Sequence, residues 1–259
     1  MKSLVNKIST VLDLERNIVG VKFLFSKEEF ENLDVKQVKN KMSYCNTVRL
    51  ASKGHSYKSE GENFLCKASA RALGTLEVDN RVVSGQDYHS FNMYNSLGTA
   101  KYVQQNVTYI DHEIHGVQVM PLSKFETDPD VVVMILNPYQ SMRVVQGYAY
   151  HKGIAKNVKF TGNQGLCSEC TATPYETNDL NVSLLCANTR FAANWQDNEM
   201  GIGMPYHLFE TVADGILKTI EPSDSDTKKE KVIERLKAKN IEVDIELGTS
   251  YYKSGRKDR

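Results

Sequence analysis

Six consecutive apolar residues, Val131 to Leu136, place the strongest constraint on how this chain folds. An apolar run of this length fits a strand that is buried on both faces of a sheet. Asn137 and Pro138 follow at once, and they suit the N-cap and the first position of a helix. We expect this helix to continue to about Lys152 and to stop at Gly153. A buried strand that passes directly into a helix indicates an α/β layer architecture.

Further patterns along the chain predict more helices and strands. Helices are expected where apolar residues recur at helical spacing, and strands where β-branched and aromatic residues cluster. The expected helices span residues 3–16, 26–33, 44–54, 66–73 and 206–220, and the expected strands span residues 19–25, 158–162, 181–186 and 199–205. We therefore predict an α/β (mixed α+β) fold, a single domain with a mixed sheet flanked by helices.

The C-terminal part of the chain is set off by a short segment rich in turn-forming residues. Glu221–Asp226 contains a proline and two serines and is interpreted as a linker. The chain is divided there into a cysteine-bearing α/β domain, residues 1–220, and an extension, residues 221–259. After the linker, the extension is expected to contain a helix around Val232–Leu236 and a strand at Ile241–Ile245, which close the fold and form no second domain.

Composition limits the partners of the chain. The 259 residues carry 32 basic and 32 acidic side chains, so the net charge is zero and no overall field attracts nucleic acid or an anionic membrane. The basic stretch from Lys253 to Arg259 is short, and such tails are usually solvated. The N-terminus lacks a secretory signal, and the longest apolar run is far shorter than the roughly 20 residues that cross a bilayer. We expect a cytoplasmic protein without nucleic-acid or membrane partners, and a homo-oligomer is compatible with the sequence.

Five cysteines are the main carriers of chemistry in the sequence. They are Cys45, Cys66, Cys167, Cys170 and Cys186. In a reducing cytosol an odd number of cysteines favours packed, metal-bound or catalytic thiols over structural disulfides. Cys45 and Cys66 each lie near the start of an expected helix, where unpaired N–H groups stabilise a thiolate or an anionic ligand.

Cys167 and Cys170 form a C-x-x-C pair close to Gly162 and Gly165. Such a turn can wrap a metal or a cluster. No second pair completes a zinc-ribbon or ferredoxin pattern. A thioredoxin-like dithiol needs a long helix after the pair, whereas we expect the proline-containing stretch 171–175 to break any helix within a turn. Each cysteine taken alone is also explained as a small buried hydrophobe.

Three sequence blocks together resemble a known family. The blocks are Cys66–Gly74, Asn137–Gln146 with Tyr148 and Tyr150, and Cys167–Pro205 with its Pro174-Tyr175, Asn181-Val182-Ser183 and Arg190. They resemble the prokaryotic family called domain of unknown function 169, also described as uncharacterised archaeal cysteine-rich proteins, over about residues 5–220. The resemblance implies cysteines in corresponding blocks at Cys45, Cys66, Cys167 and Cys186. The family tends to have Pro-Gly-Gly after the second of these cysteines, whereas this chain has Lys67-Ala68-Ser69.

The cysteines lead to three functional hypotheses. The first is an iron–sulfur protein of the kind found in anaerobes, with a 4Fe-4S cluster as first choice of cofactor and zinc as second choice. A cluster held by three thiolates leaves one iron open to a small anionic substrate. The second is a non-catalytic module that binds or carries a small molecule or metal. The third is a metal-free, thiol-dependent enzyme, and whether the chain is an enzyme at all is left open.

Four residues in the matching blocks are candidates for catalysis. They are Glu169, Arg143, Arg190 and Tyr175. The arginines can bind a carboxylate or phosphate through two hydrogen bonds, although structural ion pairs are the simpler explanation. Glu169 suits a proton carrier or the cap of a turn. Tyr175 suits the lining of a pocket or a half-buried helix face.

Overall fold

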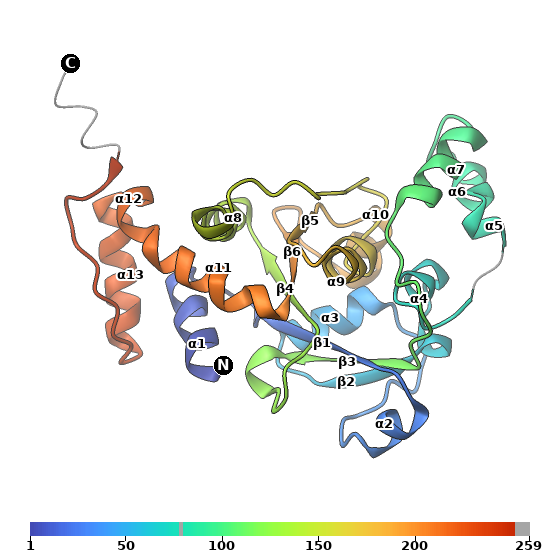
Figure 1. The fold of residues 1–259 in the computed structure, drawn as a ribbon, viewed down its shortest axis with the longest axis horizontal. Helices are drawn as coiled ribbons and strands as arrows, with labels where there is room; N and C mark the ends of the chain where they lie inside the picture. Colours follow the sequence, from blue (N-terminus) through green and yellow to red (C-terminus); the bar gives the residue numbers. More distant parts are fainter. Residues whose placement is uncertain (78–79, 252–259) are drawn as a thin grey trace.

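A six-stranded sheet forms the centre of the molecule (Figure 1). The computed structural model describes residues 1–77 and 80–251. The strands are β1 (Val19–Leu24), β2 (Tyr57–Glu60), β3 (Gly116–Pro121), β4 (Val131–Leu136), β5 (Asn181–Ser183) and β6 (Met200–Pro205), in the order β2-β3-β1-β4-β6-β5. Every neighbouring pair of these strands is antiparallel. The α/β class with helices flanking the sheet is confirmed, but the sheet is antiparallel where a mixed sheet was expected, because an apolar run reveals burial and not strand direction.

Helices surround this sheet. They are α1 (Lys2–Val11), α2 (Lys27–Asn32), α3 (Tyr44–Ser52), α4 (Lys67–Ala72), α5 (Asn80–Val83), α6 (Gln86–Ser90), α7 (Leu97–Asn106), α8 (Pro138–Lys152), α9 (Thr173–Thr177), α10 (Ala187–Ala193), α11 (Tyr206–Lys218), α12 (Ile220–Ser223) and α13 (Asp226–Ala238). Short helices of other types are η1 (Gly61–Asn63), η2 (Leu122–Lys124) and η3 (Ser168–Ala172), of which η3 is a π-helix. In the described part of the chain, no helix has the length and apolarity to cross a membrane.

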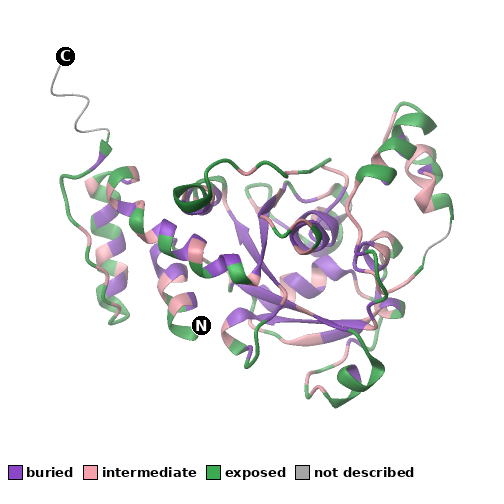
Figure 2. Cartoon of the chain, viewed as in Figure 1, coloured by how far each residue is buried: buried purple, intermediate pink, exposed green. Residues whose placement is uncertain are grey.

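The central strand β4 is buried on both faces, as predicted (Figure 2). Its odd-numbered residues, such as Val133, belong to a first apolar core that includes residues of α3 and α4. Its even-numbered residues, such as Met134, belong to a second core formed with α1, α8 and α11. The sheet therefore separates two cores, and the cysteines Cys45, Cys167 and Cys170 all lie in the first.

Capping residues define the ends of α8 as the sequence predicts. The Asn137 side chain accepts a hydrogen bond from the Gln140 backbone nitrogen at 2.9 Å, and the Gln140 side chain accepts one from the Asn137 nitrogen at 2.9 Å. This reciprocal arrangement satisfies two donors that a helix start leaves unpaired. Gly153 ends the helix with φ of 76°, a backbone conformation that suits glycine.

Two local predictions within residues 1–220 are wrong. Residues 158–162 are not a strand, because the backbone of Lys159 pairs with a side chain instead of a neighbouring strand: its nitrogen donates to Asn181 Oδ1 at 2.8 Å and its oxygen accepts from Asn181 Nδ2 at 2.9 Å. Residues 171–175 do not break the helix either. The π-helix η3 continues into α9 through Pro174, and the Glu169 carbonyl oxygen, one turn before this proline, accepts a hydrogen bond from Asn181 Nδ2 at 2.7 Å.

The C-terminal segment is joined to the domain by buried polar contacts. The residues of the expected linker form the end of α12 and the start of α13. Asp224, between these helices, is buried beside Arg143. Tyr139 donates a hydrogen bond to Asp224. Residues 241–245 are not a strand, because their partly buried apolar side chains pack on the second core while their backbone pairs with no strand of the described chain. The basic stretch from Lys253 lies outside the described residues.

Candidate functional site

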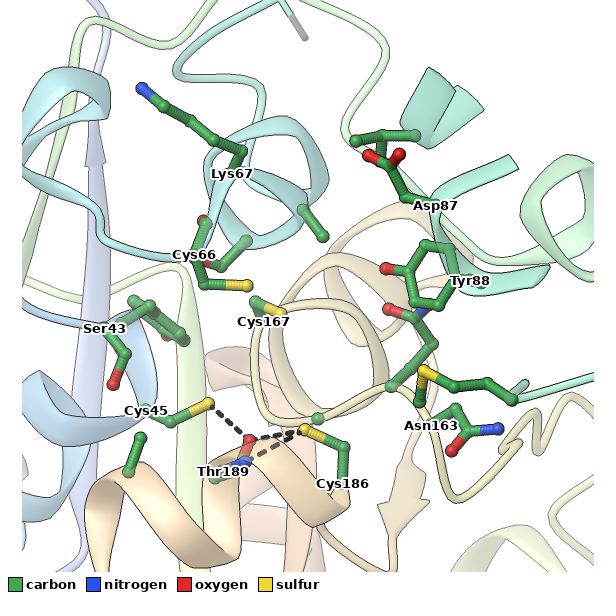
Figure 3. A pocket seen from close by; sticks show the side chains of 18 of the residues that line it. Ser43, Cys45, Cys66, Lys67, Asp87, Tyr88, Asn163, Cys167, Cys186 and Thr189 are labelled. Atoms are coloured by element: carbon green, nitrogen blue, oxygen red, sulfur yellow. Dashed lines mark hydrogen bonds between the residues drawn. The ribbon is translucent and has the colours of Figure 1, made fainter. Parts of the chain in front are cut away.

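A cavity of about 460 Å³ lies on the first-core side of the molecule, between α3, α4, α6, η3 and α10 (Figure 3). Its lining includes four thiols, those of Cys45, Cys66, Cys167 and Cys186. Two parts of the chain deliver them, one with Cys45 and Cys66 and the other with Cys167 and Cys186, and the four side chains lie around a common space in Figure 3. These are the four cysteines that the sequence blocks associate with a common site.

Each of these cysteines stands at the start of a helix. Cys66, Cys167 and Cys186 occupy the N-cap positions of α4, η3 and α10, and Cys45 is the second residue of α3. The first backbone N–H groups of a helix have no intrahelical partner and carry a partial positive charge. Backbone N–H groups interact with three of the sulfurs: that of Thr189 with Cys186, that of Leu166 with Cys45 and that of Ser168 with Cys167.

Thr189 joins two of the four thiols. Its hydroxyl oxygen lies 2.6 Å from Cys186 Sγ and 3.2 Å from Cys45 Sγ. Its backbone N–H donates to Cys186 Sγ at 3.3 Å, which caps α10. Because Thr189 is 4% exposed, these sulfur contacts are shielded from water. The sequence does not single out Thr189, because Cys186-x-x-Thr189 is not one of the usual capping patterns.

Burial and mutual repulsion raise the pKa of three of the four thiols, those of Cys45, Cys167 and Cys186. Desolvation raises the pKa of Cys45 to about 12, and repulsion from the nearby Cys186 is the second cause. Desolvation raises the pKa of Cys167 well above its usual range, and electrostatic repulsion adds to this effect from Cys45, Cys66 and Cys186. Desolvation also raises the pKa of Cys186, although hydrogen bonds from Thr189 lower it. Several thiolates can therefore coexist in this cavity only when positive charge is added.

Cys170, the other half of the C-x-x-C pair, does not line the cavity. It is fully buried, and its Sγ lies 2.8 Å from the point where a Cβ on Gly201 would be. Gly203 lies against the Cys170 backbone in the same way. The thiol of Cys170 is therefore packed between η3 and β6, as expected of a small buried hydrophobe. The π-helix delivers only Cys167 to the cavity.

The opposite side of the cavity is formed by residues 82–93 and by the loop at 163–165. Tyr88, Asp87 and Asn163 lie across the cavity from Cys45 in Figure 3. Gln164 is 5% exposed and also lines the cavity. Sequence patterns predict no helix or strand for residues 82–93, where a glycine and a cluster of tyrosines are the only signals of this side of the cavity.

Glu169 lies outside the four-thiol cavity, beside a second cavity of about 360 Å³ that Phe160 and Thr173 also line. Its carboxylate accepts hydrogen bonds from the Thr161 backbone nitrogen at 2.8 Å and from the Ser183 hydroxyl at 2.5 Å. Desolvation raises the pKa of Glu169 to about 7, although these two hydrogen bonds lower it. Glu169 therefore ties η3 to the neighbouring loop and to β5.

The arginine candidates are placed as structural groups. The Arg143 guanidinium is 1% exposed, and it donates to the backbone oxygens of Ile216 and Thr219, each at 3.1 Å, at the end of α11. Arg190 donates to three backbone oxygens, those of Leu184, Gln196 and Glu199. These contacts satisfy carbonyl groups of loops and of a helix end, and neither arginine lines the four-thiol cavity.

Tyr175 also lies away from the four-thiol cavity. Its ring packs edge-on against Phe23 with centroids 4.7 Å apart, and its hydroxyl lies 3.5 Å from His112 Nε2. The structure thus brings together Cys45, Cys66, Cys167 and Cys186. It places Cys170, Glu169, Arg143, Arg190 and Tyr175 elsewhere.

The thiols surround a cavity and do not meet at one point. Within residues 1–77 and 80–251, no three histidine, cysteine, aspartate or glutamate side chains gather closely enough to hold a single metal ion. The donor set itself suits iron or zinc, since both bind cysteine thiolates.

The fold and the cavity define a helix-flanked antiparallel-sheet protein with four thiols at four helix starts. Residues 7–215 match the domain of unknown function 169, described as uncharacterised ArCR, and the chain belongs to this family. It is 26% identical over 216 residues to an uncharacterized protein of Methanocaldococcus jannaschii, an alignment that covers 81% of this chain and 91% of that protein. No solved structure matches the chain.

Proposed function

We propose that the four-thiol cavity binds an iron–sulfur cluster through Cys45, Cys66, Cys167 and Cys186, with a 4Fe-4S cluster as the best fit. One observation carries the proposal: four cysteines from four separate helix starts line one cavity. Four thiolates are the usual ligand set of this cluster type. Packing alone gives no reason for four thiols to share a cavity wall.

The volume of the cavity supports a cluster over a single zinc ion. One water molecule takes up about 30 Å³ in the liquid. At this volume per heavy atom, the eight atoms of a cubane core need about 240 Å³. The cavity offers about 460 Å³. A zinc ion requires all its sulfurs within roughly 2.3 Å of one point, so the four helix starts would have to move inwards. Zinc remains the second choice of metal.

The residues around the thiols suit the electrostatics of such a group. The Thr189 hydroxyl and backbone N–H reach Cys45 and Cys186, and hydrogen bonds to cluster sulfurs set the reduction potential. When bound, the cluster supplies one-electron transfer. Burial of two of the four thiols, those of Cys45 and Cys167, shields this side of the cavity from water.

Catalysis at an open iron is a second candidate function, and Cys66 favours it. This cysteine is partly exposed, and its Sγ has no hydrogen-bond partner among the described residues, unlike Cys45 and Cys186. Cys66 is thus the least restrained of the four thiols. A small anionic substrate that replaced it would gain access to one iron as a Lewis acid.

The alternatives have less support. A metal-free thiol enzyme needs a reactive thiolate, whereas burial raises the pKa of Cys45 to about 12 and leaves its thiol a weak nucleophile near neutral pH. A non-catalytic carrier would use the same cavity without electron transfer. We place the protein in the cytoplasm, where reducing conditions preserve free thiols.

Isolation under anaerobic conditions tests the proposal. Iron, acid-labile sulfide and zinc are measured per chain, together with the visible spectrum. We expect about four iron and four sulfide per chain and a broad visible absorption. A colourless, iron-free chain contradicts the proposal, and one zinc per chain without sulfide assigns the thiols to a structural zinc site.

A further inference from the structure

Two of the four thiols, those of Cys45 and Cys186, share a hydrogen-bonding atom. The hydroxyl oxygen of Thr189 lies 3.2 Å from Cys45 Sγ and 2.6 Å from Cys186 Sγ, and Figure 3 shows both contacts. We call Cys45 and Cys186 the thiol pair. Two sulfurs that contact the same oxygen are close neighbours, so small rotations of the two side chains bring both sulfurs to one ion.

Gly165 shows independently that the two sulfurs converge. A Cβ on this glycine would lie 3.2 Å from Cys186 Sγ and 3.6 Å from Cys45 Sγ, so both sulfurs surround one point on the cavity wall. The same Cβ would lie 2.8 Å from the Thr189 hydroxyl oxygen. Because the residue is a glycine, no side chain fills the space beside the thiol pair.

Backbone N–H groups are in place to stabilise the thiol pair when it is deprotonated. The Thr189 N–H donates to Cys186 Sγ at 3.3 Å, and the Leu166 N–H interacts with Cys45. Hydrogen bonds to a charged acceptor are about twice as strong as those to a neutral one. A complex of two thiolates with a monovalent ion carries one negative charge, which these N–H groups offset.

The number of available ligands selects the ion. Among residues 1–77 and 80–251, no three histidine, cysteine, aspartate or glutamate side chains gather closely enough to hold a single metal ion. Zinc almost always takes four ligands in structural sites. Cu(I) is a soft ion that thiolates select, and two thiolates are enough to bind it. Two converging sulfurs without a third ligand therefore suit Cu(I) better than zinc.

We propose that the thiol pair binds one Cu(I) ion between Cys45 Sγ and Cys186 Sγ when the cavity holds no cluster. Each thiol releases its proton to the solvent as its sulfur–copper bond forms, and copper remains in the +1 state throughout. Cys186 is partly exposed, which gives the ion access from the solvent. This site does not require the proposed cluster. In a chain that also binds the cluster, the ion and the cluster compete, because both use these two thiols.

A competition titration tests the copper site. Cu(I) is added under anaerobic conditions to the iron-free chain in the presence of bathocuproine disulfonate, a chelator that is coloured when it binds Cu(I). We expect the chain to withhold one Cu(I) from the chelator, and copper X-ray absorption to show two sulfur neighbours. A chain that withholds no Cu(I), or an ion with three or more sulfur neighbours, overturns the inference.

Four variants locate the ion. Cys45→Ser and Cys186→Ser should each weaken Cu(I) binding at least about tenfold, since loss of a group that merely supports a metal ligand already costs about tenfold to hundredfold. Cys167→Ser should keep the affinity, because this thiol lies in the cavity but outside the thiol pair.

Cys170→Ser is the matched control for these variants, because Cys170 is a cysteine outside the cavity. It should bind Cu(I) as tightly as the unchanged chain. Circular dichroism checks the folding of each variant. Affinity that survives in folded Cys45→Ser and Cys186→Ser, or falls equally in Cys167→Ser, overturns the assignment to the thiol pair.

Iron analysis of the same chain separates this inference from the proposed function. A chain that never takes up iron but withholds Cu(I) through the thiol pair refutes the cluster and supports the copper site. A chain that takes up iron and sulfide but leaves all Cu(I) to the chelator when iron-free supports the cluster and refutes the copper site.

Discussion

Cys167 and Cys170 are three residues apart, yet their thiols lie on different sides of the π-helix η3. Cys167 lines the four-thiol cavity, and Cys170 is packed against Gly201 of β6. A C-x-x-C pair that suggests a shared metal or a dithiol is thus divided between a site and a core. This division gives the first test of which cysteines are ligands.

Replacement of Cys167 and Cys170 by serine should have opposite effects on iron content. Cys167→Ser removes a thiolate from the cavity, so the cluster and its visible absorption should be lost. Cys170→Ser should keep both and lower the free energy of unfolding by about 1–2 kcal/mol, because a hydroxyl replaces a buried thiol. Iron analysis and urea unfolding of the two variants check this, and equal loss of iron in both contradicts the assignment.

Thr189→Val should make the reduction potential of the site more negative. The variant removes the hydroxyl between Cys45 and Cys186, and hydrogen bonds to sulfur stabilise the more negative, reduced state. A bond worth about 1 kcal/mol corresponds to roughly 40 mV for one electron. A redox titration followed by electron paramagnetic resonance measures the shift.

Thr189→Ser is the matched control for this potential, because it keeps the hydroxyl and loses only a methyl group. Its potential should stay close to that of the unchanged protein. An equal shift in the serine and valine variants would assign the effect to packing instead of hydrogen bonding.

Glu169 should make stability depend on pH between about 4.5 and 7. Burial raises the pKa of Glu169 from its usual 4.5 to about 7, so across this window the unfolded chain releases a proton that the folded chain keeps. The contribution of Glu169 to the free energy of unfolding is therefore fully present below pH 4.5. It falls by about 3 kcal/mol in total as the pH rises to 7.

The Glu169→Gln variant isolates this contribution, because glutamine does not titrate. The difference in unfolding free energy between the metal-free protein and the variant is measured at pH 4.5 and at pH 8. Between pH 4.5 and pH 8, the unchanged protein should lose about 3 kcal/mol of unfolding free energy relative to Glu169→Gln. A difference that is constant with pH would show that Glu169 titrates normally.

Arg143→Met should destabilise the chain without affecting the thiol site. The variant removes the hydrogen bonds to the end of α11 and leaves Asp224 buried without its guanidinium partner, at a cost of about 3 kcal/mol. Urea unfolding measures the loss, and iron content should be unchanged. Lys27→Met, which breaks an exposed ion pair with Glu31, should change stability little. Loss of iron in Arg143→Met without loss of stability contradicts this structural role.

Much of the fold could be predicted because its signals are local. The apolar run Val131–Leu136 and the capping residues Asn137 and Gln140 determine β4 and α8 within one short stretch. The same local rules failed at Lys159, whose backbone pairs with the side chain of Asn181, since a long-range partner leaves no periodic trace. Sequence patterns also gave no direction for the strands.

The sequence predicts which cysteines share the candidate site, but it does not predict how they are arranged. The four cysteines were grouped through sequence blocks, and the helix starts of Cys45 and Cys66 were visible as local patterns. The separation of Cys167 from Cys170 depends on a π-helix, which sequence periodicity does not reveal. Gln164 joins the site only because the tertiary fold brings its loop to the cavity.

The most direct test of the central claim is an anomalous difference map at the iron absorption edge, from crystals grown under anaerobic conditions. We predict one strong iron peak per chain, inside the cavity and bordered by Cys45, Cys66, Cys167 and Cys186. The absence of iron from this cavity, or iron bound at Cys170 instead, would contradict the account.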